Sequence, residues 1–173
     1  MKVLMVYPEY PETFWSFKHA LKFVSKRAAY PPLGLMTVSA MLPEEWEKKL
    51  IDMNTDTLSD EDILNSNYVM ISSMDIQFDS AKKVLQRCKD LGVKTIAGGP
   101  LFTTRPEEFS EVDHLVLGEA EVTLAPFLHD LEKGQAKHIY KSDGFPDISN
   151  SPIPDWKLLD MRKYSSMNIQ YSR

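Results

Sequence analysis

Short apolar runs that alternate with helical patterns restrict the fold of this 173-residue chain more than any other feature. Five such runs are predicted as strands, and they occupy residues 2–7, 48–54, 68–74, 94–98 and 113–118. Helices are predicted over residues 14–25, 31–43, 59–66, 75–92, 106–110 and 120–134. Alternation of this kind implies a parallel sheet with helices on both faces, joined by right-handed crossovers.

The expected architecture is therefore an α/β fold of the flavodoxin-like, Rossmann type, with three layers and a five-stranded parallel sheet. The helix over 75–92 is the clearest element, because its apolar residues share one face and Gly92 follows as a C-terminal glycine. Ser59 and Asp62 have the spacing of a capping box. Pro126 leaves the start of the last helix open, and Gly34 is expected to permit close helix-to-strand packing.

Composition and charge exclude several classes of protein. A net charge of -5 argues against a general nucleic-acid binder, which needs massed lysine and arginine. The densest basic run, residues 18–27, is interpreted as a surface helix with a solvated basic face rather than a polyanion site. The single cysteine, Cys88, permits no disulfide within the chain and is expected in the core. No run is long and apolar enough to span a membrane, so we expect a cytoplasmic protein without membrane or nucleic-acid partners.

The segments that follow the predicted strands are the places where a ligand is expected, because parallel sheets bind ligands beyond their carboxyl ends. These exits read YPEYP (7–11), SSMD (72–75), GGPLFT (98–103) and GEAE (118–121). Glycines there leave backbone amides uncovered, and the hydroxyls of Ser72, Ser73, Thr103 and Thr104 can donate hydrogen bonds. For any single loop the alternative stays open that glycine and proline only turn the chain.

No catalytic group can be assembled from the sequence. Both common nucleotide signatures, G-x-G-x-x-G and G-x-x-x-x-G-K-[ST], are absent. Glu119 and Glu121 could pair as acid and base, but beside a helix start they more simply complement the helix dipole. The four histidines are scattered without metal-ligand spacing, at positions 19, 114, 129 and 138. We therefore predict neither a catalytic residue nor a metal site.

Four segments, taken in order and spacing, resemble one known family. They are YPPLGL (30–35), AGGPLFT (97–103), VLGEAE (116–121) and PIPDWKLLDMRKY (152–164). Together they resemble the N-terminal cobalamin-binding region of cobalamin-dependent radical S-adenosylmethionine enzymes, over nearly the whole chain. In that family the loops commonly read PPLGL, GGPH-x-T and GEGE. Leu101 stands here in place of the histidine, which we expect to remove a polar contact, and Ala120 in place of the second glycine.

The resemblance implies a domain that holds cobalamin at the carboxyl edge of the sheet, with the nucleotide tail passing the third, fourth and fifth strand exits. The implied contacts, transferred by position, are Ser72, Ser73, Met74, Gly98, Gly99, Pro100, Thr103, Gly118, Glu119 and Glu121. Because the first exit lacks the D-x-H-x-x-G motif of methionine-synthase-type domains, we expect cobalamin to bind base-off and without a histidine ligand.

The resemblance also implies a longer parent protein. Residues 1–141 would form the cobalamin-binding-like domain, and residues 142–173 a linker and the start of a radical S-adenosylmethionine barrel. One cysteine cannot supply the C-x-x-x-C-x-x-C motif that holds a 4Fe-4S cluster, so this chain alone is expected to be catalytically inert. S-adenosylmethionine and the cluster would belong to the missing part, which would be the main protein partner.

Two other readings of the fold remain. A signalling receiver needs an acidic pair after the first strand, an aspartate at the third and a lysine after the fifth. Glu9, Glu12 and Asp75 fit in part, but no lysine follows the fifth strand. A module that binds a partner domain and no small molecule would keep the same fold.

Overall fold

A sheet of six parallel strands forms the centre of the structure, a computed structural model that describes residues 1–12, 21, 23–142, 144, 146, 147, 149 and 151–169. The strand order is β2-β1-β3-β4-β5-β6. The strands are β1 (Lys2–Tyr7), β2 (Glu47–Asp52), β3 (Tyr68–Ser72), β4 (Lys94–Gly98), β5 (His114–Leu117) and β6 (Ile139–Lys141). The first five strands confirm the flavodoxin-like order. The chain places β2 on one side of β1 and then adds β3, β4 and β5 on the other side.

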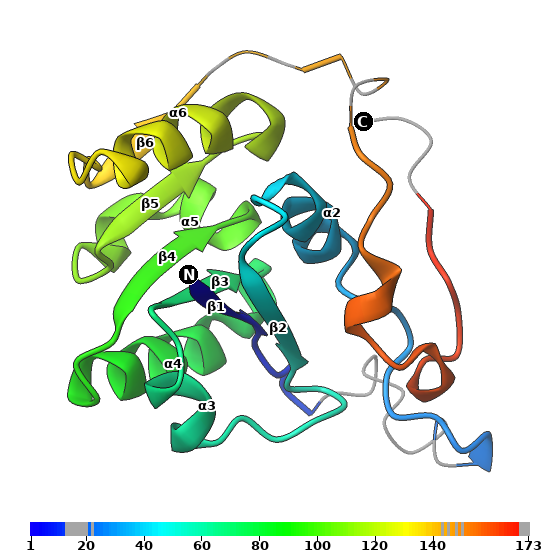
Figure 1. Ribbon diagram of the computed structural model, residues 1–173. Helices are drawn as coiled ribbons and strands as arrows, with labels where there is room; N and C mark the ends of the chain where they lie inside the picture. The colour runs from blue at the N-terminus through cyan, green and yellow to red at the C-terminus, as the bar shows by residue number, and fades with distance from the viewer. Residues whose placement is uncertain are drawn as a thin grey trace.

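Helices cover both faces of this sheet (Figure 1), which confirms the predicted three layers. Helices α2 (Leu33–Met41) and α6 (Ala120–Glu132) pack on one face, and α3 (Asp60–Leu64), α4 (Phe78–Asp90) and α5 (Pro100–Thr104) on the other. The residues of β1 alternate between these layers. Val3 and Met5 contact the α2 and α6 side, whereas Leu4 and Val6 contact the α4 side.

The prediction of five strands was wrong by one. The sixth strand, β6, pairs with β5 in parallel, and Leu115 lies beside Ile139. It was missed because it has only three residues, of which Tyr140 alone is buried. The Tyr140 ring packs edge-on against Phe127, and its hydroxyl donates a 2.8 Å hydrogen bond to Asp130. Tertiary contacts of one tyrosine thus hold a strand that has no apolar run of its own.

The helices agree with the sequence in outline and differ in detail. The capping box of Ser59 and Asp62 is present at the start of α3, and α4 presents the predicted apolar face. Pro126 lies inside α6 on its exposed side, so the proline does not mark the start of the helix. The predicted helix over 106–110 is instead a 3-10 turn, Pro106–Phe109, and the short helix α5 before it was not predicted.

Two predicted elements lie largely outside the described residues. The helix expected over 14–25 falls mostly on residues 13–20 and 22, which the structure does not describe. By its sequence, the stretch SMNIQYSR (166–173) could form one more strand. Residues 166–169 are not in a strand, and residues 170–173 lie outside the described part.

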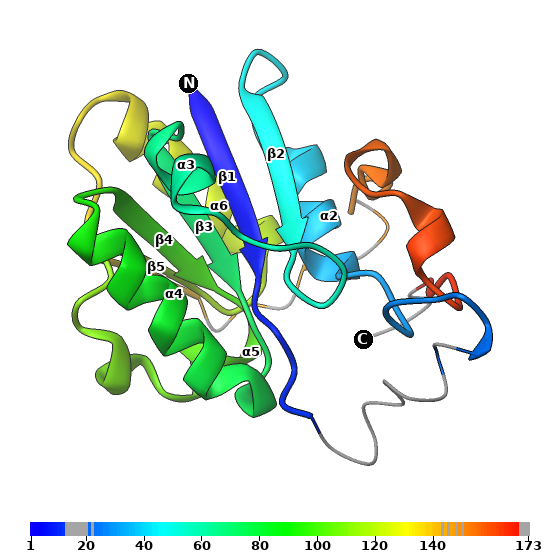
Figure 2. The same cartoon turned by 90° about the horizontal axis from the view of Figure 1, so that it is seen from below.

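The segment after β6 returns to the β2 edge of the domain (Figure 2). It contains two 3-10 turns, Trp156–Leu158 and Met161–Lys163, and forms a single parallel bridge between Ala28 and Tyr164. The backbone N–H of Asp155 donates to the carbonyl of Met36 in α2 at 3.1 Å. The described part of residues 151–169 is therefore packed onto the domain.

Two further sequence inferences can be compared with the structure. Cys88 is fully buried in α4, as predicted, and burial raises the pKa of its thiol to about 11. Among the described residues, no helix is both long and apolar enough to cross a membrane.

Candidate functional site

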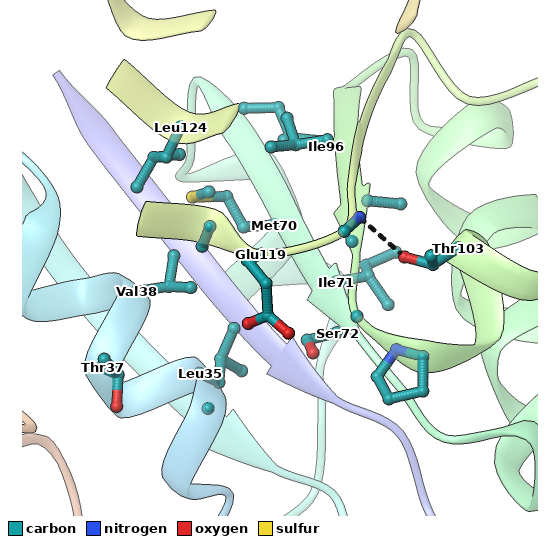
Figure 3. A pocket seen from close by; sticks show the side chains of 18 of the residues that line it. Leu35, Thr37, Val38, Met70, Ile71, Ser72, Ile96, Thr103, Glu119 and Leu124 are labelled. Carbon is teal, nitrogen blue, oxygen red and sulfur yellow. Dashed lines mark hydrogen bonds between the residues drawn. The ribbon is translucent and has the colours of Figure 1, made fainter. Parts of the chain in front are cut away.

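A cavity of about 500 Å³ opens at the carboxyl edge of the sheet, between helices α2 and α6 and the ends of β3, β4 and β5 (Figure 3). Its inner wall is apolar and consists of Leu35, Val38, Met70, Ile96, Val116 and Leu124. Its polar side chains gather where the strands end, and Figure 3 shows Ser72, Thr103 and Glu119 on that side. The cavity has the size and mixed lining typical of a small-molecule site.

Most of the contacts implied by the family resemblance line this cavity. Eight of the ten do so, namely Ser72, Gly98, Gly99, Pro100, Thr103, Gly118, Glu119 and Glu121. Two lie beside it. Ser73 is buried behind the β3 exit, and its hydroxyl oxygen has no hydrogen-bond partner among the described residues. Met74 is 47% exposed and accepts a 3.6 Å hydrogen bond from the Tyr10 hydroxyl.

The two glycines that end β4 are required by the packing of the chain itself. A Cβ at Gly98 would lie 2.7 Å from the carbonyl oxygen of Val116 in β5. Gly99 has a φ of 88°, and a Cβ there would lie 2.6 Å from the hydroxyl oxygen of Ser72. The tight strand exit therefore explains both glycines by itself, and their place on the cavity wall adds uncovered backbone.

The β4 and β5 exits are joined by a hydrogen bond across the cavity wall. The hydroxyl oxygen of Thr103 accepts from the backbone N–H of Gly118 at 3.0 Å, as the dashed line in Figure 3 shows. The hydroxyl of Thr104 donates to the carbonyl of Pro100 in the same helix, α5, at 3.0 Å. The bond between Thr103 and Gly118 fixes the two loops relative to each other, so this part of the cavity wall is formed before a ligand binds.

Three residues singled out in the sequence can now be placed. Leu101 is fully buried in the core under α4, and its side chain does not line the cavity. Ala120 does line the cavity, at the first residue of α6. Gly34 makes no close helix-to-strand contact, because a Cβ there would meet nothing within 4 Å. It is exposed and lies at the cavity wall instead.

The charges around the cavity are acidic. Glu119 and Glu121 line it, whereas no lysine, arginine or histidine is among its described lining residues. The Glu119 carboxylate points toward Ser72 (Figure 3), and Glu121 accepts a hydrogen bond from the Ser151 hydroxyl. A ligand that presents hydroxyl or amide donors at this rim would suit the carboxylates.

A polar network that sequence reasoning missed holds the exit of β1. The carbonyl of Pro8 accepts from Asn54 Nδ2 at 3.2 Å and from Gln77 Nε2, and the Tyr7 and Tyr10 hydroxyls lie 2.7 Å apart. Burial raises the pKa of Tyr7 far above its usual range. The residues of this network follow three different strands, β1, β2 and β3. The one signal in the sequence was the polar residue Asn54 directly after the second strand.

The described histidines lie away from the cavity. His114 begins β5, and its Nδ1 is 2.8 Å from the carbonyl of Lys137, at the amino edge of the sheet. His138 bonds the carbonyl of Asp113 at that same edge. His129 is nine residues after the start of α6, about 13 Å along the helix at 1.5 Å per residue. No metal-binding cluster of histidine, cysteine, aspartate or glutamate exists among the described residues.

Comparison with known proteins decides the family. The sequence profile described as the B12-binding domain matches residues 24–128, more than half of the chain. The chain belongs to the B12-binding domain family. The matched range contains every element around the cavity, from α2 to most of α6.

The relatives of this B12-binding domain are named as methyltransferases. It is 38% identical over 175 residues to an uncharacterized methyltransferase of Synechocystis sp., and 28% identical over 176 residues to the hopanoid C-2 methylase of Rhodopseudomonas palustris. It is 23% identical over 149 residues to the bacteriochlorophyllide d C-12(1)-methyltransferase of Chlorobaculum tepidum. These matches cover 100%, 99% and 83% of the chain, which spans 33% of the length of each relative.

The residues of the cavity fit a B12 cofactor. An apolar interior suits an aromatic base, and the rim carboxylates suit the hydroxyl and amide donors that surround a cobamide. The unpartnered Ser73 hydroxyl at the β3 exit is a further buried group that a ligand or water could satisfy.

Proposed function

We propose that this chain is the cobalamin-binding domain of a larger cobalamin-dependent radical S-adenosylmethionine enzyme of the methyltransferase type. The observation that carries the proposal is the cavity of this B12-binding domain. Eight of the ten contacts that the family resemblance implied lie on its wall, at one edge of the sheet. Bound cobalamin would supply methyl transfer at its cobalt. Residues of this chain would hold it, with Glu119 and Glu121 accepting from its donors and Gly98 to Pro100 offering bare backbone.

The cobalamin is proposed to bind base-off and without a histidine ligand. None of the three described histidines lies near the cavity, and the β1 exit contributes Tyr7 and Tyr10 instead. An absorption spectrum of the complex tests this directly. A base-off spectrum without a histidine ligand is expected, and a histidine-on spectrum would refute the proposal. Because His19 lies outside the described residues, the spectrum is also recorded for His19→Ala, and we expect the same base-off spectrum as for the parent chain.

Binding itself is tested by titrating the purified chain with hydroxocobalamin and following co-elution on a sizing column. Stoichiometric co-elution at micromolar concentration is expected. Failure to bind would favour a module that contacts a partner domain without a small molecule. Thr103→Val is a useful variant in the same assay, because it removes the hydrogen bond that joins the β4 and β5 loops and is expected to weaken binding.

The parent enzyme is a separate part of the proposal. It supposes that residues 142–173 lead into a barrel that holds a 4Fe-4S cluster and S-adenosylmethionine, which one cysteine in this chain cannot do. The relatives named as methyltransferases, of which the chain spans a third, support it. The coding sequence beyond Arg173 tests it, because a C-x-x-x-C-x-x-C motif is expected there. Its absence would remove the radical-enzyme assignment and leave cobalamin binding intact.

A further inference from the structure

We propose that the cavity selects among cobamides by their lower base, and that it favours an apolar benzimidazole-type base over a purine such as adenine. This inference rests on the proposed function, since it concerns which B12 cofactor the domain accepts. Its basis is the contrast between the inner wall of the cavity and its rim.

The shape of the cavity limits which part of a cobamide can enter it. A volume of about 500 Å³ between two helices and the sheet suits a flat aromatic group. The corrin ring is larger and carries polar amide side chains around its edge, which would be left unpaired against aliphatic residues. The nucleotide tail ends in an aromatic base, so the base is the part that fits the interior.

The inner wall offers a base almost nothing to hydrogen-bond with. Its side chains come from Leu35, Val38, Met70, Ile96, Val116 and Leu124, and the thioether sulfur of Met70 is the one weak acceptor among them. The backbones of β3, β4 and β5 are engaged with one another, through pairs such as Met70 with Ile96 and Gly98 with Val116. Backbone groups of the strands behind the inner wall are thus also occupied, and the uncovered backbone of Gly99 and Pro100 lies beyond the end of β4.

Two threonines of the cavity wall donate their hydroxyl protons within the protein. The third, Thr103, accepts there and lies with Ser72 on the strand-end side of the cavity rather than on the inner wall. Thr37 donates to the carbonyl of Leu33 at 3.0 Å, Thr104 donates to Pro100, and Thr103 accepts from Gly118. The carboxylates of Glu119 and Glu121 belong to the rim at the start of α6. Adenine has an amino group and several ring nitrogens that lose their water on entering such a site, whereas dimethylbenzimidazole replaces most of them with methyl and ring carbon.

The test compares three corrinoids on the intact chain by titration: hydroxocobalamin, its adenine-containing analogue, and cobinamide, which lacks the tail. We expect cobalamin to bind at least about tenfold more tightly than either of the others, which corresponds to ~1.4 kcal/mol. Equal affinity for cobalamin and the adenine analogue would overturn the selectivity. Equal affinity for cobinamide would show that the base does not occupy the cavity, which also overturns it. Binding of none would refute the proposed function itself.

Val38→Asn supplies a second, independent measurement. Val38 is half-buried on α2 and points into the cavity in Figure 3, so the change places an amide there without disturbing the deep core. Asparagine can pair with two adjacent polar atoms of adenine. We expect the variant to narrow or reverse the preference for cobalamin, whereas the apolar control Val38→Leu should keep it. An unchanged preference in Val38→Asn, with an unfolding midpoint close to that of the parent chain, would contradict the proposal.

Discussion

The hydroxyl of Tyr164 donates a 2.9 Å hydrogen bond to Oδ2 of Asp52, a carboxylate buried at the end of β2. The other oxygen of Asp52 accepts from the backbone and side-chain nitrogens of Asn54, at 2.9 and 2.6 Å. Burial raises the pKa of Asp52. Because Tyr164 lies in the segment after β6, this single contact ties the C-terminal segment to the opposite edge of the sheet. Lys163 adds an ion pair with Asp56 at 2.5 Å.

Tyr164→Phe is expected to lower the free energy of unfolding by about 1–3 kcal/mol, because it leaves a buried carboxylate without one of its donors. Urea unfolding followed by circular dichroism measures the change. Tyr30→Phe is the matched control, since Tyr30 is 60% exposed and should tolerate the loss of its hydroxyl. Equal stability of the two variants would show that the contact with Asp52 is unimportant.

The stability contributed by Asp62 is expected to depend on pH. Partial burial acts to raise the pKa of this carboxyl, but hydrogen bonds from Lys49 and Ser59 hold it at about 2, below its ordinary 3.8. A lowered folded-state pKa means that the contribution is present above 3.8 and is lost as the pH falls toward 2. Asp62→Asn should therefore flatten the acid limb of a stability-against-pH curve, and an unaltered limb would contradict this assignment.

Alanine substitutions at three glycines separate steric contact from backbone strain. Gly134 has a φ of 68° and open space around it, so Gly134→Ala should cost only the left-handed strain, about 1–2 kcal/mol. Gly98→Ala meets a strand carbonyl at 2.7 Å and should cost about 1–3 kcal/mol. Gly99→Ala combines strain with displacement of Ser72 and should destabilise more than Gly134→Ala. Thermal unfolding ranks the three, and a harmless Gly98→Ala would disprove the close approach.

Gly34 is expected to lower the stability of α2 and to leave the entrance of the cavity open. Because it lies in the first turn of α2 with free space before it, Gly34→Ala should stabilise the chain by about 0.5–1 kcal/mol. Gly34→Phe should fill the entrance and weaken cobalamin binding at least about tenfold, or ~1.4 kcal/mol. Lys83→Phe on the exposed side of α4 controls for an added aromatic group. Full affinity in Gly34→Phe would place the ligand elsewhere.

Leu101→His is expected to destabilise the chain without improving cobalamin binding, although it restores the residue usual in the resembled family. Leu101 is fully buried with Phe102 and Phe109 in the core under α4, where an imidazole would lack partners. A loss of about 2–3 kcal/mol would show in urea unfolding. A gain in affinity with stability unchanged would mean that this side chain can reach the ligand.

The layers followed from the sequence because they depend on local periodicity, and the order of the first five strands followed from the alternation of strands and helices. Apolar runs of four to six residues bounded by turn residues are typical of strands buried on both faces, and ligands bind beyond the carboxyl ends of such strands. Eight of the ten residues implied as cofactor contacts line one cavity. The strand β6 escaped prediction because it has only three residues, and its one buried side chain, Tyr140, is held by contacts with Phe127 and Asp130 of α6.

The sequence by itself determined that this chain forms a parallel α/β sheet and where along it a cofactor could be held. Only the tertiary structure decided what each residue there does. In the structure the side chain of Leu101 lies in the core, and open space surrounds Gly34. The carbonyl of Val116 lies where a side chain at residue 98 would be. It also joined Tyr164 to Asp52. The reason is physical: periodicity reports which face of an element is buried, whereas contacts between elements are set by packing across the whole sheet.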